Sequence, residues 1–184
     1  MILSNKKSVS TGYVFFIAFC ILASSTNLSA AELANVVVRN SADELLIDIK
    51  LIGVFTEEMK AAVSKGIPID IAFSVSLYEA HNFWFDKKII GKTAIHQIRF
   101  DTLKKEYKIR RSWEKRGFRV EKDPGEAQRI LSEIKDFEVI RRKRLEKGAH
   151  YQLRIKSELQ DRSYVFSGTP WEFETDWYTI NFIY

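Results

Sequence analysis

Apolar and polar residues alternate along several short stretches of this chain. In residues 44–51, every second side chain is Leu or Ile, and Asp48 and Lys50 lie between them. Residues 69–78 repeat the alternation with Ile, Ile, Phe, Val and Leu. A period of two places these apolar side chains on one face of a β-strand. The same pattern predicts strands at residues 33–39, 89–100, 105–110, 117–120, 138–142, 151–158, 164–167 and 177–184.

Two stretches have the period and the end signals of a helix. The first begins after Thr56, which can cap it, and closes at Gly66. The second begins after Asp123 with a proline at its first position, which favours a helix start. We expect it to continue to about Lys135, with Ile134 on its inner face.

The order of these elements predicts the fold class. Strands at short spacing with two inserted helices favour antiparallel pairing over a βαβ arrangement. We therefore expect a mainly β fold with two short helices, built as an antiparallel β-sandwich or an open barrel. No Gly/Ser-rich linker divides residues 32–184, so they are expected to form a single domain.

The N-terminal residues 1–31 have the features of a secretory signal peptide. Two lysines precede an apolar run at residues 13–23, which is short for a membrane span. Ser29 and Ala31 are small residues suited to a cleavage site before Glu32. An uncleaved N-terminal anchor is the alternative interpretation.

The single cysteine, Cys20, lies within that apolar run. The mature chain would then contain no cysteine and form no disulfide. Exported eukaryotic domains of this size often carry disulfides, whereas periplasmic proteins often do without them. We therefore expect an exported bacterial protein located in the periplasm, or anchored to the membrane if the signal is retained.

Several short phrases occur in an order that resembles a known family. They are Gly66-Ile67-Pro68-Ile69, Trp84-Phe85-Asp86, Ile98-Arg99-Phe100, Tyr107-Lys108-Ile109 and Asp176-Trp177. The chain resembles a family of uncharacterised exported proteobacterial proteins, the domain of unknown function 4390. The resemblance implies a bacterial envelope location. It implies no established activity and no catalytic residue.

Reactive motifs are absent from the sequence. His81, His96 and His150 lie far apart and in no metal-binding spacing, so we expect no metal site. There is no GxSxG elbow, no mature cysteine nucleophile and no glycine-rich nucleotide loop. We expect a protein that is not an enzyme and has no cofactor. An unrecognised hydrolase would need one of the histidines beside a carboxylate and a nucleophile.

Basic residues are concentrated in two segments. Residues 99–122 contain ten Lys or Arg and four acids, and residues 135–156 contain eight and three. Such clusters attract anions. The expected location argues against nucleic acid as the ligand, and the missing glycine-rich loop argues against a nucleotide. An envelope protein or an anionic lipid surface is the expected partner of a binding module. The alternative is that these cations protect strand edges from aggregation. The candidate binding residues are Trp84, Arg110, Arg111, Arg141, Arg142, Lys143 and Arg144.

The aromatic phrase at residues 81–86 has three interpretations. It is an exposed recognition loop, since Trp is favoured as an interface anchor, or a packed turn that covers the end of the core. Alternatively, Phe83, Trp84 and Phe85 line the mouth of a pocket for a small ligand or lipid inside the sandwich.

Overall fold

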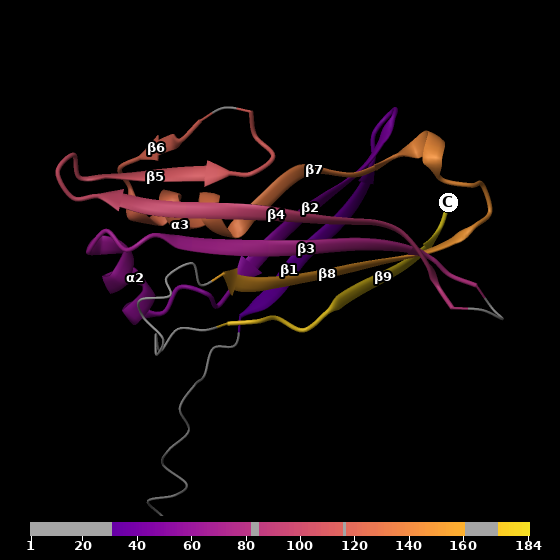
Figure 1. Ribbon diagram of the computed structural model, residues 1–184, viewed down its shortest axis with the longest axis horizontal. Helices are drawn as coiled ribbons and strands as arrows, with labels where there is room; N and C mark the ends of the chain where they lie inside the picture. The colour runs from indigo at the N-terminus through magenta and orange to yellow at the C-terminus, as the bar shows by residue number, and fades with distance from the viewer. Residues whose placement is uncertain (1–30, 82–84, 116, 161–172) are drawn as a thin grey trace, which may run out of the picture.

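The computed structural model describes residues 31–81, 85–115, 117–160 and 173–184 (Figure 1). Within these residues the chain forms strands, two α-helices and one short 3-10 helix. The strands are β1 (Glu32–Asn40), β2 (Glu44–Ile52), β3 (Ile69–Glu79), β4 (Lys87–Asp101), β5 (Glu106–Arg111), β6 (Arg119–Glu121), β7 (Glu133–Arg141), β8 (His150–Gln160) and β9 (Tyr178–Ile183). The helices are α2 (Glu57–Ser64), α3 (Pro124–Ser132) and η1 (Arg142–Arg144).

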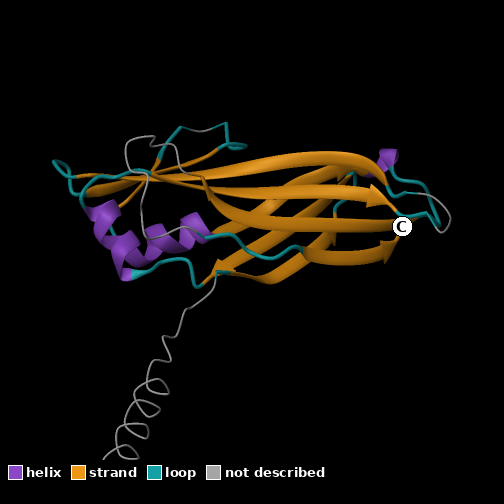
Figure 2. Ribbon diagram, turned by 60° about the horizontal axis from the view of Figure 1, so that its bottom comes forward, coloured by secondary structure: helices purple, strands orange, loops and turns teal. Residues whose placement is uncertain are grey.

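The strands form two antiparallel sheets. The smaller sheet has the order β1-β2-β7, and the larger has the order β6-β5-β4-β3-β8-β9. The small sheet crosses one face of the large one, and α2 and α3 lie beside it at one end (Figures 1 and 2). Neither sheet closes on itself. The predicted mainly β, single-domain antiparallel sandwich is confirmed, and the fold is not a closed barrel.

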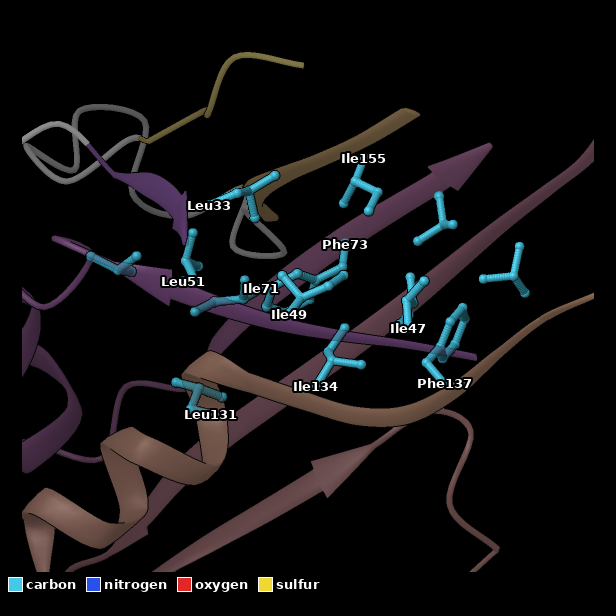
Figure 3. Close-up of a cluster of buried hydrophobic side chains, with 14 of the residues drawn as sticks. Leu33, Ile47, Ile49, Leu51, Ile71, Phe73, Leu131, Ile134, Phe137 and Ile155 are labelled. Carbon is cyan, nitrogen blue, oxygen red and sulfur yellow. The ribbon is translucent and has the colours of Figure 1, made fainter. Parts of the chain in front are cut away.

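The core lies between the two sheets (Figure 3). Ile47 and Ile49 of β2 and Ile134 of β7 point toward Ile71 and Phe73 of β3, and each of these side chains is at most 2% exposed. Burying one such side chain contributes roughly 1.5–3 kcal/mol. The alternation predicted for residues 44–51 and 69–78 therefore places the expected side chains inside.

Both helix starts form as the sequence predicts. The Thr56 hydroxyl accepts a hydrogen bond from the Met59 N–H at 3.2 Å, and the Asp123 carboxylate accepts one from the Glu126 N–H at 2.7 Å. Gly66 follows α2 with φ +86°, a backbone conformation that side chains with a Cβ rarely adopt.

The second helix ends earlier than its pattern suggests. A helix to about Lys135 and a strand from residue 138 were both wrong, because α3 stops at Ser132 and β7 begins at Glu133 without a connecting loop. Ile134 would be buried in a helix as well as in a strand. The structure places it in β7, where it pairs with Ile49 of β2. Its hydrogen-bonding partner is distant in sequence, so the local helical period does not reveal it. The strand predicted at residues 164–167 lies outside the described residues.

Candidate functional site

The two basic segments do not form one face. Residues 99–122 form the β5–β6 edge of the large sheet, whereas residues 135–156 form β7, η1 and much of β8. Arg110 pairs with Gln97 at the level of the first residues of β3, while the η1 segment lies near the opposite end of β3. At about 3.3 Å per residue, nearly the whole of β3 separates these levels, which is about 30 Å.

Four cationic side chains gather around η1, near the end of β3. Arg141 ends β7, Lys143 and Arg144 are in η1, and Lys147 follows it; all four are exposed. No ion pair involves any of them within the described residues. We call these four residues the basic end. Their charges are uncompensated by direct contact with acids.

Arg142 anchors this segment. Its Nε donates to the Tyr184 hydroxyl at 2.8 Å, and its Nη1 donates to the carbonyls of Ser41 at 3.1 Å and Ala42 at 3.3 Å. Its backbone N–H donates to the Asp43 carbonyl at 2.8 Å. Arg142, predicted as a binding residue, therefore holds η1 against the β1–β2 turn and the C-terminal strand.

A hollow of about 770 Å³ lies beside this anchor. Its lining residues are Ala42, Asp43, Glu44, Arg141, Arg142, Lys143, Leu145, Lys147 and Tyr184. The lining combines cations from one side with two carboxylates, Asp43 of the β1–β2 turn and Glu44 at the start of β2. Such a lining can hold an anionic group by charge attraction.

The other two predicted arginines differ sharply from each other. Arg110 is exposed, on the outer side of β5. The Arg111 side chain is only 12% exposed, and its Nη2 donates to the carbonyls of Ile130 at 2.9 Å and Glu133 at 3.1 Å. Its Nη1 donates to Glu114 at 2.9 Å. Arg111 therefore satisfies carbonyl groups where α3 passes into β7.

A buried histidine lies under the same junction. His96 is fully buried, and its Nδ1 is 2.6 Å from the Leu131 carbonyl oxygen, so Nδ1 carries the proton in the neutral ring. The ring stacks on Trp113 with centroids 4.8 Å apart and lies 5.1 Å from the Phe73 ring. Burial lowers the pKa of His96 to about 3, and the nearby Arg111 charge adds to this effect. His96 is a neutral core residue at neutral pH.

His81 and His150 are both exposed. No group of three or more His, Cys, Asp or Glu that could hold a metal ion occurs in the described part of the chain. Across residues 31–81, 85–115, 117–160 and 173–184, no helix has the length and apolar character needed to span a bilayer.

The aromatic phrase is described only in part. Trp84 lies outside the described residues, as does Phe83. Phe85 is 97% exposed, so the packed interpretation is wrong for this residue. It lies just before β4, and the start of β4 is at the same end of the molecule as η1 (Figures 1 and 2).

A family model matches residues 29–181, nearly the whole described fold, and its description is domain of unknown function (DUF4390). The chain belongs to this family. No curated protein and no solved structure matches it, so the assignment rests on the family model. The predicted membership of this family is thereby confirmed, and the DUF4390 assignment itself carries no activity.

Sequence reasoning missed two contributors to the site of this DUF4390 protein. Lys147 adds one cation to the run at residues 141–144. The composition of residues 141–147, with five basic residues and one acid, could have indicated it. Tyr184 was noted only as an aromatic residue, because nothing in the sequence indicates that it contacts Arg142.

Proposed function

We propose that this DUF4390 protein is a non-enzymatic binding module of the cell envelope that holds a negatively charged partner at the basic end. The observation that carries the proposal is the group of four exposed cations without an acid partner in the described structure, beside a hollow of about 770 Å³. The Arg142 anchor supports it, because a site held in place loses less entropy on binding.

Several cations elsewhere on the surface are paired with acids, although Arg110 and Lys122 form no ion pair within the described residues. Arg39 pairs with Asp48 at 2.8 Å, and Lys108 pairs with Asp101 at 2.8 Å. Arg129 pairs with Glu133 at 2.8 Å. These pairs neutralise one another, so they offer less attraction to an external anion than the basic end does.

Edge protection explains the basic end poorly. Lysines that block aggregation lie along the exposed edge of a strand. Lys143, Arg144 and Lys147 lie beyond the last residue of β7 and before the first of β8, outside every described strand. Only Arg141 belongs to an edge strand. The position of these cations therefore favours a binding role.

The N-terminal residues support the proposed compartment. Their charged start, short apolar run and small residues before Glu32 fit export. Outside the cytoplasm, the abundant anionic groups are lipid phosphates and acidic protein segments. A partner of this kind fits the basic end better than a nucleic acid does.

Site-specific photo-crosslinking in the native cell tests this proposal. A photoreactive residue at position 143 of the full chain is expected to give a defined adduct, whereas the same residue at exposed Lys104, at the β4–β5 turn, is not. Arg141→Ser, Arg144→Ser and Lys147→Ser together should remove the adduct. Equal labelling at both positions, or no adduct at position 143, would contradict the proposal.

A second candidate function is suggested by an apolar groove between α2 and α3. It has a volume of about 470 Å³, and its apolar lining includes Phe55, Val63, Ile98 and Tyr107. This size suits a small ligand, although the groove lies beside the helices and not inside the sandwich. Binding of anilinonaphthalene sulfonate that is lost in Ala61→Arg but kept in the control Leu103→Arg, an exposed residue outside the groove lining, would support it. Equal binding by both variants would count against it.

A further inference from the structure

Three chain segments meet at the end of the sandwich where the four residues of the basic end lie. The segment after β3 is joined to β8 by the Ala80 N–H, which donates to the His150 carbonyl at 2.8 Å. The segment after η1 is joined to the C-terminal strand by the Gly148 N–H, which donates to the Tyr184 carbonyl at 2.6 Å. Both ribbon views show the end of β3, the start of β4, η1 and the C-terminus at one end of the molecule (Figures 1 and 2).

This end exposes large apolar side chains. Phe85 is 97% exposed and Ile183 is 65% exposed. Asp86 follows Phe85, and Lys87 and Lys88 come next; all three are exposed. An aromatic ring held in water beside cations is an arrangement suited to the boundary between lipid headgroups and acyl chains, where the apolar ring leaves water while the charges stay hydrated.

The charges at this end complement an anionic surface. Within residues 141–147 there are five basic residues and one acid. Among the acids of this end, Glu79 pairs with Lys87 at 3.7 Å and Asp86 pairs with Arg154 at 3.3 Å, while Asp43 and Glu44 line the hollow. A basic residue close to an anionic membrane contributes about 1 kcal/mol of attraction. The uncompensated cations therefore give this end a net attraction to lipid phosphates.

We propose that this end docks on an anionic phospholipid bilayer, with Phe85 entering the headgroup region and the four residues of the basic end meeting lipid phosphates. This inference rests on the proposed function and names its partner. An acidic protein fits less well, because a protein interface usually has a continuous apolar core. Here the two exposed apolar side chains come from separate segments: Phe85 precedes β4, and Ile183 is the last residue of β9.

An environment-sensitive fluorophore at position 85 of the full chain tests the proposal. Cys20→Ser removes the native thiol, and Phe85→Cys provides the attachment point. The apolar N-terminal segment partitions into any vesicle, so only the local environment of the label reports docking. We expect a blue shift on phosphatidylcholine vesicles that contain phosphatidylglycerol, and none on phosphatidylcholine alone. A label at Leu103, which is 93% exposed on the β4–β5 turn, should shift on neither.

Two matched variants separate this site from general charge. Serine at Arg141, Lys143, Arg144 and Lys147 should lower the ratio of docked to undocked chains by on the order of a thousandfold. Serine at Arg99, Lys104, Arg110 and Lys122 removes the same number of exposed cations from the other end and should change the ratio little. Raising the salt concentration should also release the docked form.

The outcomes distinguish this inference from the proposed function. A label at position 85 that stays in water on anionic vesicles overturns lipid docking. So does an equal shift on both vesicle types, or a shift that survives removal of the four cations. If a photoreactive residue at position 143 then still captures a protein, the proposed function stands without the lipid. If it captures nothing, both fail.

Discussion

Arg142 and Tyr184 are 42 positions apart in the sequence, yet the Arg142 Nε donates to the Tyr184 hydroxyl at 2.8 Å. The guanidinium carbon also lies 5.5 Å from the centre of the Tyr184 ring. This contact joins η1 to the end of the C-terminal strand, while the same guanidinium reaches the Ser41 carbonyl of the β1–β2 turn. One side chain therefore links three segments that surround the basic end.

Removing this anchor should destabilise the fold. Arg142→Ala should lower the free energy of unfolding by about 1.5–3 kcal/mol, because a charged donor is lost and carbonyl acceptors lose their partner. Tyr184→Phe should cost about 1 kcal/mol. Urea denaturation of the single and double variants should show coupling of about 0.5 kcal/mol or more. The exposed neighbour Arg141→Ala should stay within about 0.5 kcal/mol of wild type. Additive losses in the double variant would contradict a direct contact.

The neutral, buried His96 should make stability depend on pH. Its folded-state pKa is lowered to about 3, so the unfolded chain binds a proton first as the pH falls. The free energy of unfolding should therefore be fully retained above about pH 6.5 and fall between pH 6.5 and 3, by up to about 1.4 kcal/mol per pH unit. Urea denaturation at pH 7 and pH 5 measures the difference.

His96→Phe is the matched control for this pH dependence. The variant removes the titrating ring and leaves the Leu131 carbonyl without its donor, so it should be less stable at every pH. Its loss of stability between pH 7 and pH 5 should nevertheless be smaller than in wild type by about 2 kcal/mol. An identical loss in both proteins would show that His96 is not the titrating group. His150→Phe, at an exposed position, should leave the wild-type pH dependence intact.

Arg111 should matter for stability where Arg110 does not. Arg111→Ala removes a largely buried side chain whose Nη2 serves two carbonyls, and it should cost about 2–4 kcal/mol. Arg111→Lys should restore little, because an ammonium cannot reproduce the planar fork of the guanidinium. Arg110→Ala should change the unfolding free energy by less than about 0.5 kcal/mol. Thermal denaturation of the three variants compares them, and similar midpoints for both alanine variants would refute the structural role.

The cap of α3 offers a local test. Asp123→Ala removes the acceptor for the Glu126 N–H and should destabilise the protein by about 1 kcal/mol. Asp123→Asn keeps an acceptor oxygen and should lose much less. A similar loss in both variants would point to the charge of Asp123 and not to its hydrogen bond. Urea denaturation measures both.

Sequence patterns predicted the local elements because each depends on near neighbours. The alternation in β2 and β3 placed the correct side chains in the core, and Thr56 and Asp123 mark real helix starts. The end of α3 was missed because Ile134 is buried in a helix or in a strand alike. The pairing of Ile134 with Ile49 of β2 decided between them, and that contact is distant in sequence.

The basic segments show the same division. The sequence by itself determined that cations cluster in residues 99–122 and 135–156, that apolar strands alternate, and that residues 1–31 have the features of a secretory signal. Only the tertiary structure decided that the two clusters lie at different ends, that Arg111 and Arg142 are anchors, and that Lys147 and Phe85 belong to one exposed end. Periodicity reports which face a side chain takes, whereas strand order depends on pairing between distant segments, which no local pattern encodes.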